Sequence, residues 1–267
     1  MISEKDIRLL NQVRDTNPEI YNLIERMQQN QATTMSKISH RLKNIISIIS
    51  SSLQFIESQH PETSDFNLWP QLRSSTKYLV QFMDQEAIYR HSANIELKLM
   101  NLQDLLWSIP DIMDDLYELD TNNCMRNYNY DIASNIPEIN GDYSKLKYAL
   151  IEIMKNAYEA TSDNDTITIS ACIIDSSVNI TIKDKGVGID INAINEATVP
   201  FFTTKNDHVG TGLSIAKRII RSHGGNLTLS SDEETCVTIT LTLYYTYIKS
   251  NSLRQIYLNS FRLYKII

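Results

Sequence analysis

The chain has 267 residues, 42% of them apolar, which is enough for one large domain or two modest ones. The net charge of −7, from 25 basic and 32 acidic residues, argues against non-specific electrostatic binding to nucleic acid, so no nucleic-acid partner is expected. The three cysteines, Cys124, Cys172 and Cys236, are too scattered for a disulfide framework or a zinc site, and we expect buried thiols in a reducing compartment.

The apolar runs of the chain are short. None approaches the ~20 residues that a membrane-spanning helix needs, so no transmembrane segment is expected. Residues 1–12 contain Glu4 and Asp6 and have no apolar centre, which is unlike a signal peptide. These features predict a cytoplasmic protein.

Residues 1–94 are predicted to form a helical hairpin. Apolar residues recur every three or four positions over residues 38–56, which is one stripe along an amphipathic helix. This helix should end before Pro61, and a second helix should run to about His91. Because a lone hairpin cannot cover both of its apolar stripes, we expect two copies to pair as a four-helix bundle, that is, as a homodimer. A hairpin packed only on its own domain is the alternative.

In residues 95–243, patterns typical of strands alternate with patterns typical of helices. This order predicts an α/β sandwich, with a mixed sheet on one side and helices on the other. Together with the hairpin, this makes an α+β chain. The predicted strands are residues 95–100, 125–132, 166–174, 178–183, 227–230 and 236–243, and the predicted helices are residues 102–119, 142–161 and 211–223.

The last residues, 244–267, differ again from the rest of the chain. They hold four basic residues, five tyrosines and no acidic residue. We interpret them as a basic, tyrosine-rich tail. It is either a structural appendage or a contact for a membrane surface or a partner.

Glycine is rare in this chain and concentrated in one stretch. Six of the seven glycines lie between residues 186 and 225. Asp184 ends a predicted strand, and Gly186 and Gly188 follow it. This pattern favours a carboxylate at the floor of a pocket, with the chain turning closely beside a ligand. Taken alone, it is also ordinary turn chemistry.

Two further segments suggest phosphate and metal chemistry. The run Gly210-Thr211-Gly212-Leu213 opens a predicted helix, and the backbone N–H groups of such a helix start attract phosphate. Glu152 and Asn156 lie four residues apart and therefore on one helix face, where they could hold Mg²⁺ against phosphates. The alternative for this pair is an ordinary solvated helix face.

Between these glycine pairs lies a segment with two aromatic residues followed by hydroxyl and basic residues, Pro200-Phe-Phe-Thr-Thr204-Lys205. Each of the four elements has an ordinary explanation when seen alone. Their order and separation along one chain favour a nucleotide site.

The four segments resemble the N, G1, F and G2 boxes of the GHKL-type ATPase fold, shared by sensor histidine kinases, gyrase-type topoisomerases, Hsp90-type chaperones and anti-sigma-factor kinases. The resemblance covers residues 95–243 and implies ATP and Mg²⁺ as ligands. It implies that Asn156 binds Mg²⁺, which its spacing would let it share with Glu152, and that Asp184 meets the adenine amino group. By the same resemblance, Gly186 and Gly188 shape the base pocket.

The resemblance also implies which residues surround the phosphates. These are Gly210, Thr211, Gly212 and Leu213, with Thr204 and Lys205 in a short lid over residues 203–209. The chain departs from the family pattern in two places. The glycine box has one glycine fewer than usual, and Lys185 replaces a more usual asparagine.

A histidine in the hairpin completes the resemblance. His40 is two residues, about 200°, from Ile38, so it projects away from the apolar stripe. The segment Ser39-His40-Arg41-Leu42-Lys43-Asn44 resembles the H-box of histidine kinases, in which the imidazole accepts the γ-phosphoryl group. Arg41 stands where most of these kinases have an acid, so proton removal would fall to Glu152 or to solvent. Asn44 matches a position that in related kinases orients water for dephosphorylation of the partner receiver domain.

The leading hypothesis is therefore an ATP-dependent, autophosphorylating protein-histidine kinase. It would pass the phosphoryl group to an aspartate of a response-regulator receiver domain and could also act as the phosphatase of that regulator. The alternative is a phosphorelay module with a regulatory or idle ATP site. An anti-sigma-type serine kinase is disfavoured by the histidine-bearing hairpin. A topoisomerase or chaperone ATPase gains support from Glu152 but would need further domains.

Overall fold

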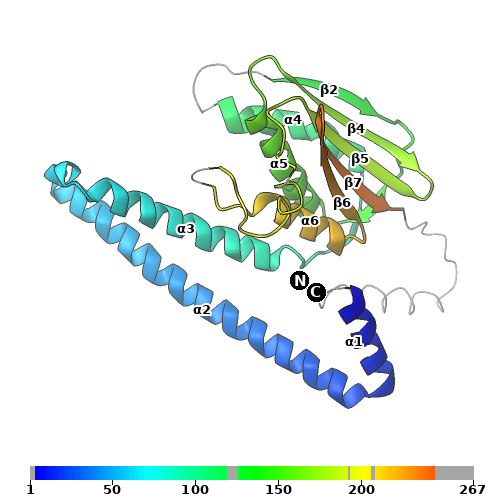
Figure 1. The fold of residues 1–267 in the computed structure, drawn as a ribbon, viewed down its shortest axis with the longest axis horizontal. Coiled ribbons are helices and arrows are strands. Elements are labelled where there is room, and N and C mark those ends of the chain that lie inside the picture. Colours follow the sequence, from blue (N-terminus) through cyan, green and yellow to red (C-terminus); the bar gives the residue numbers. More distant parts are fainter. Residues whose placement is uncertain (1–3, 119–125, 192, 206–207, 244–267) are drawn as a thin grey trace. The chain divides into compact units, whose positions relative to one another are not determined.

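The structure is a computed structural model that describes residues 4–118, 126–191, 193–205 and 208–243 (Figure 1). The predicted tail, residues 244–267, lies outside the described residues. The chain divides into two compact units between Ala87 and Ile88, and each unit is described by itself.

The first unit is the predicted helical hairpin. Its elements are α1 (Glu4–Thr16), α2 (Pro18–Gln59), the short 3-10 helix η1 (Pro61–Asp65) and α3 (Trp69–His91), the last turn of which belongs to the second unit. The expected helix ends before Pro61 and at His91 are confirmed. Helix α1, which the apolar pattern did not show, is separated from α2 at Asn17, where the Asn17 side chain accepts a hydrogen bond from Ile20 N at 3.2 Å.

Polar contacts join the two long helices of the hairpin, which diverge from their connecting turn in Figure 1. Lys43 Nζ of α2 lies 2.5 Å from Asp84 Oδ1 of α3. Near the connecting turn, Glu57 accepts hydrogen bonds from Trp69 Nε1, at 2.7 Å, and from Arg73.

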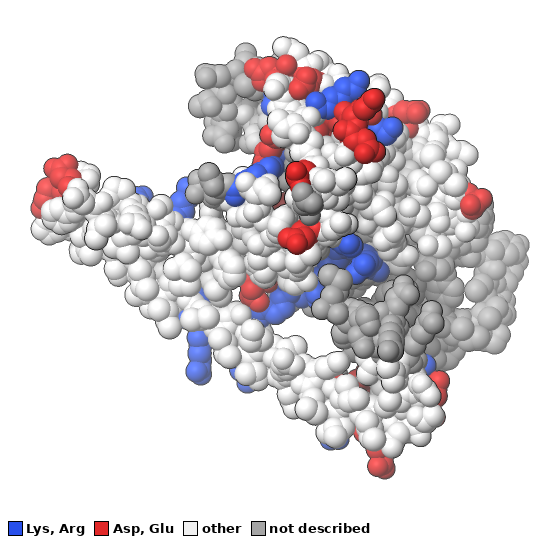
Figure 2. Space-filling model, viewed as in Figure 1, with Lys and Arg blue, Asp and Glu red and all other residues white. Residues whose placement is uncertain are grey.

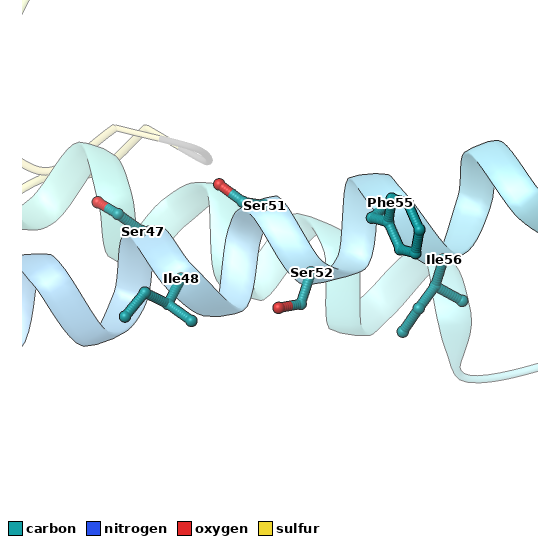
Figure 3. A pocket seen from close by; sticks show the side chains of 6 residues that line it. All are labelled: Ser47, Ile48, Ser51, Ser52, Phe55 and Ile56. Carbon is teal, nitrogen blue, oxygen red and sulfur yellow. The ribbon is translucent and has the colours of Figure 1, made fainter.

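The apolar stripe of α2 stays exposed in the single chain. Ile38 is 47% exposed, Ile45 54% and Ile49 45%. Figure 3 shows a neighbouring part of the same helix, where Ile48 and Phe55 project from the surface among serines. Among the described residues, no helix combines the length and the apolar character needed to cross a bilayer.

The second unit contains two sheets. Two short strands, β1 (Lys98–Met100) and β3 (Ile139–Gly141), pair antiparallel, and β3 was not predicted. The main sheet has the order β2-β4-β5-β7-β6, with β2 parallel to β4 and the other neighbours antiparallel. Its strands are β2 (Asn127–Ile132), β4 (Thr166–Ile174), β5 (Ser177–Asp184), β6 (Asn226–Ser231) and β7 (Thr235–Thr242).

Helices α4 (Leu102–Glu118), α5 (Tyr143–Ala160) and α6 (Gly212–Ser222) cover one face of this sheet (Figure 1). The strands alternate as half-buried strands do, so Ile167 and Ile169 of β4 are buried against Ile153 of α5 and other core residues. The predicted sandwich, with a mixed sheet on one side and helices on the other, is confirmed.

The expectation that the cysteines are buried is wrong for both that the structure describes. Cys172 is exposed and Cys236 is partly exposed, and both thiols are free. The reason is strand alternation, because Cys172 follows the buried Ala171 and therefore points to the other face of β4. Cys124 lies outside the described residues.

Candidate functional site

Asp184 is the last residue of β5 and is only 4% exposed. Its Oδ1 accepts a hydrogen bond from Gly186 N at 3.0 Å, and its Oδ2 can accept a hydrogen bond from another donor. Burial raises the pKa of this carboxyl group, and the nearby negative charge of Glu234 raises the pKa further, against the effect of the Gly186 N–H. The strand therefore ends in a buried acceptor, as the sequence predicted.

The two glycines after Asp184 have different structural reasons. A Cβ at Gly186 would lie 2.2 Å from Ala160 O, at the end of α5, so only glycine permits this approach. Val187 N donates to the same Ala160 O at 3.0 Å. Gly188 has a φ of +74°, a conformation that favours glycine. The loop is thus fastened to the end of α5.

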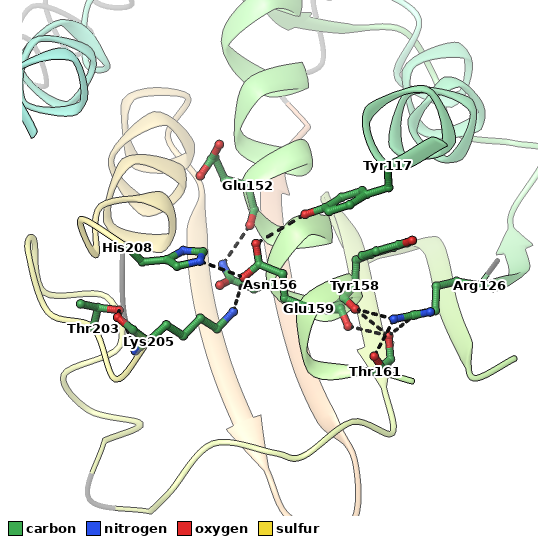
Figure 4. Close-up of polar contacts among 11 residues, drawn as sticks. Tyr117, Arg126, Glu152, Asn156, Tyr158, Glu159, Thr161, Thr203, Lys205 and His208 are labelled. Carbon is green, nitrogen blue, oxygen red and sulfur yellow. Dashed lines mark hydrogen bonds and ion pairs between the residues drawn. The ribbon is translucent and has the colours of Figure 1, made fainter. Parts of the chain in front are cut away.

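Arg126, which was not predicted from the sequence, also binds that end of α5. Its guanidinium donates to Thr161 O at 2.7 Å and Thr161 Oγ1 at 3.0 Å, and it lies 4.5 Å from the centre of the Tyr158 ring (Figure 4). An arginine in an expected strand carries no signal of this role, because its partners are more than thirty residues away.

Glu152 and Asn156 lie on one face of α5, as their spacing predicted. Asn156 Nδ2 donates to Glu152 O at 2.9 Å, which leaves Oδ1 available to coordinate a cation. Glu152 Oε1 lies 3.2 Å from Lys155 Nζ. Carboxylate and amide oxygens are ligands that Mg²⁺ uses in proteins.

The start of α6 lies beside Glu152. A Cβ on Gly212 would come within 2.5 Å of Glu152 Oε2. Thr211 is buried at the N-cap, and its side chain makes no capping hydrogen bond, so backbone N–H groups at this helix start can meet an anion. Gly210 has a φ of +73°, and Leu213 packs on the core. The structure therefore brings the predicted phosphate segment and the predicted metal segment together.

The lid segment, which we define as residues 203–205 and 208–209, reaches across to α5 (Figure 4). Lys205 Nζ lies 2.5 Å from Glu159 Oε2, and His208 Nε2 lies 3.9 Å from the same oxygen. Thr204 is exposed. Glu159 was not predicted from the sequence. The signal was available, because residues 152, 156 and 159 follow the spacing of one helix face.

His40 and Asn44 belong to the first unit, and both are exposed on α2. Between them, Lys43 is fixed to α3 by its ion pair with Asp84. The predicted site residues thus fall into two groups, one on the hairpin and one in the sandwich.

The residues of the second unit fit ATP and Mg²⁺. The buried Asp184 acceptor suits an amino group, while the start of α6 and the Lys205 ammonium suit phosphates. No group of three or more His, Cys, Asp or Glu side chains that could hold a metal occurs in the described part of the chain. Glu152 and Asn156 would therefore share a Mg²⁺ ion with phosphate and water oxygens.

Residues 141–245 match the family described as histidine kinase-, DNA gyrase B- and HSP90-like ATPase. Sporulation kinase C of Bacillus subtilis (strain 168) is 29% identical over 200 residues, which cover 73% of this chain and 44% of that kinase. The signal transduction histidine-protein kinase AtoS of Escherichia coli (strain K12) is 36% identical over 114 residues, 42% of this chain and 19% of AtoS. The chain thus spans less than half the length of these curated relatives.

Two solved structures of histidine kinases share the fold. Full-length ShkA in complex with AMPPNP matches 79% of this chain and 46% of its own, with a TM-score of 0.60 and 17% identity. ThkA in complex with the response regulator protein TrrA matches 82% of this chain and 65% of its own, with a TM-score of 0.57 and 20% identity. Residues 141–245 of the sandwich are therefore similar to an ATPase domain that histidine kinases share with DNA gyrase B and HSP90.

Proposed function

We propose that the chain is an ATP-dependent protein-histidine kinase, because residues 141–245 match the family described as histidine kinase-, DNA gyrase B- and HSP90-like ATPase. It phosphorylates its own His40 and passes the phosphoryl group to an aspartate of a response regulator. The observation that carries the proposal is the grouping of Asp184, Asn156, Glu152 and the start of α6 in one domain that follows a histidine-bearing hairpin. The relative ThkA was solved with a response regulator.

In this proposal the second unit, with the predicted boundaries 95–243, binds ATP and Mg²⁺, and ATP supplies the γ-phosphoryl group. Asp184 accepts a hydrogen bond from the adenine amino group, and the loop through Gly188 turns beside the base. The start of α6 and Lys205 neutralise phosphate charge. Asn156 Oδ1 and the Glu152 carboxylate hold the metal ion. Positioning and charge neutralisation account for most of the rate of such transfers.

The hairpin, with the predicted boundaries 1–94, supplies the nucleophile. A neutral imidazole nitrogen is a competent nucleophile near neutral pH, and His40 is exposed on α2. Arg41 cannot accept a proton, so Glu152 or solvent removes it, while the guanidinium neutralises phosphate charge. Asn44, one turn further along α2, orients water when the regulator is dephosphorylated.

The exposed stripe of α2 supports a homodimer, because a second hairpin would cover it. The free thiols of Cys172 and Cys236 are compatible with the reducing cytoplasm, where we place the kinase.

The test is autophosphorylation with labelled ATP and Mg²⁺. The wild-type protein should take up label that is acid-labile and base-stable, as a phosphoramidate is, and His40→Gln should lose it while still binding ATP. His60→Gln is the matched control, because His60 is an exposed histidine paired with Glu62 at 2.9 Å. Label that survives in His40→Gln, or that is acid-stable, would contradict the proposal.

Two variants define roles within the site. Glu152→Ala should depress autophosphorylation more than nucleotide affinity if Glu152 takes the proton. Asn44→Ala should leave autophosphorylation in place and slow dephosphorylation of the regulator. A wild-type protein that takes no label from ATP but accepts it from a phosphorylated receiver would favour the phosphorelay module instead.

A further inference from the structure

Glu159 of α5 contacts three side chains from two other parts of the second unit (Figure 4). Its Oε2 lies 2.5 Å from Lys205 Nζ and 3.9 Å from His208 Nε2, both of the lid segment. Its Oε1 accepts a hydrogen bond from Tyr117 OH of α4 at 3.4 Å. The Glu159 side chain is 27% exposed and that of Lys205 38%. The contact is therefore partly shielded from water, where ion pairs are stronger than at an open surface.

The position of Glu159 matters for any phosphate bound at this site. It lies one turn beyond Asn156 on the same face of α5, so its negative charge faces the region where the metal and phosphates would sit. Lys205 is the basic residue of the lid segment that the sequence predicted for the phosphates. In the structure its ammonium group is committed to Glu159.

We propose that Glu159 is an autoinhibitory counter-ion, which holds Lys205 and the lid segment on α5 until the phosphates of a bound nucleotide compete for the lysine. The proposal rests on the proposed function, because it concerns the same nucleotide site. Nucleotide must break or share the Lys205–Glu159 pair, and it must also approach a carboxylate of the same sign. Both effects weaken binding of the phosphate groups. Neither acts on the nucleoside.

The first experiment measures binding of MgATP and of adenosine by isothermal titration calorimetry. Glu159→Gln should bind MgATP about three- to tenfold more tightly, which is the size expected for a partly exposed pair plus the lost repulsion. Adenosine affinity should stay the same. Glu196→Gln removes the same charge from an exposed position of the loop before α6. This control should change neither the affinity for MgATP nor that for adenosine.

The pair itself is tested by a cycle of variants. Lys205→Gln should weaken MgATP binding. In a protein that carries Lys205→Gln, Glu159→Gln should increase MgATP affinity less than it does in the wild type, because no lysine remains to be released from Glu159. Unchanged or weaker MgATP binding in Glu159→Gln would overturn the proposal, and weaker binding would instead make Glu159 a residue that positions Lys205.

A second experiment separates this proposal from the proposed function. Without nucleotide, hydrogen exchange of residues 203–205 should be faster in Glu159→Gln than in the wild type and unchanged in Glu196→Gln. The charge-swapped variant Glu159→Lys with Lys205→Glu should restore the protection. If the wild-type protein bound no nucleotide, the proposed function would fail, and this exchange measurement would still decide whether Glu159 holds the lid segment. Equal hydrogen exchange of residues 203–205 in the wild type and all variants would overturn the proposal that Glu159 holds the lid segment.

Discussion

The two units of this chain differ in where their apolar residues lie. Among the described residues of the hairpin, Met83 is the one apolar residue that is buried, while Ile38, Ile45 and Ile49 of α2 are exposed. The second unit buries a continuous core between the sheet and its three helices. Both regions contain amphipathic elements. Among the described residues, only the second unit has a layer that covers these elements.

This difference separates two sources of stability. Burial of apolar surface is the main driving force of folding, and it contributes about 25 cal/mol per Å². The sandwich gains it within one chain. The hairpin gains it only when another surface covers the stripe of α2, so its stability should depend on protein concentration.

The largest effect is expected from charges on the exposed stripe. Ile45→Asp with Ile49→Asp should raise the dimer dissociation constant by about a thousandfold or more, because four apolar side chains of the bundle are replaced by unpaired charges. Light scattering over a range of concentrations measures this, and MgATP binding should be unchanged. Asn30→Asp with Gln54→Asp is the control at polar positions of the same helix. A wild-type protein that is monomeric at tens of micromolar would contradict the homodimer.

Truncation of a buried residue should act on the second unit alone. Ile169 is 1% exposed in β4, and Ile169→Ala should lower the free energy of unfolding of this unit by about 2–5 kcal/mol. The loss should be the same at all protein concentrations. Ile48→Ala, at a position that is 66% exposed, should have an effect that varies with concentration. Thermal unfolding at two concentrations compares them, and a concentration-dependent loss for Ile169→Ala would contradict the contrast.

Asp184→Asn should weaken ATP binding by about 1–3 kcal/mol, roughly ten- to a hundredfold, because the amide presents a mismatched group to adenine. The fold should survive. Burial raises the pKa of Asp184, so its contribution to stability is present below the ordinary value of 3.8 and is lost as the pH rises through the raised pKa. The variant should therefore be at least as stable as the wild type at neutral pH. Calorimetry and thermal unfolding measure both, and unchanged affinity would remove Asp184 from the pocket.

The smallest effect concerns His223, which is buried at the end of α6. The His223 Nε2 accepts a hydrogen bond from Asp142 N at 2.9 Å, and its Nδ1 lies 2.8 Å from Ile219 O. This arrangement needs the neutral imidazole ring with its proton on Nδ1. Burial lowers the pKa of His223, so the unfolded chain takes up the proton first. The stability from the neutral ring is present above the ordinary value of 6.5 and is lost as the pH falls through the lowered pKa.

The second unit should therefore lose about 1 kcal/mol of unfolding free energy on acidification from neutral pH through this window. His223→Gln should show a smaller loss over the same window. His60→Gln, at an exposed position, should behave as the wild type. Equal pH dependence in His223→Gln and the wild type would show that another group is responsible.

Much of the second unit could be predicted from local pattern. The strand Thr166–Ile174 was predicted with the bounds that the structure has, because β-branched residues alternate strictly there. Strand β3 was missed because three residues carry too little periodicity, and its pairing with β1 is a long-range contact. Asp184, Gly186 and Gly188 were found because they are adjacent in sequence and have distinct chemistry. Arg126 was not found, because its partners come from a distant segment. Glu159 was missed although it shares the helix face of Glu152 and Asn156.

The sequence by itself determined the helical hairpin, the order of most strands and helices and the segments predicted for the site, since helix and strand periodicity and glycine placement act over a few residues. Only the tertiary structure decided that Gly212 lies against Glu152, that Gly186 meets the end of α5 and that Lys205 lies on Glu159. These contacts depend on how α5 and α6 pack against the sheet. The physical reason is that packing joins residues through space, and a local pattern contains no information on which distant segment will fill that space.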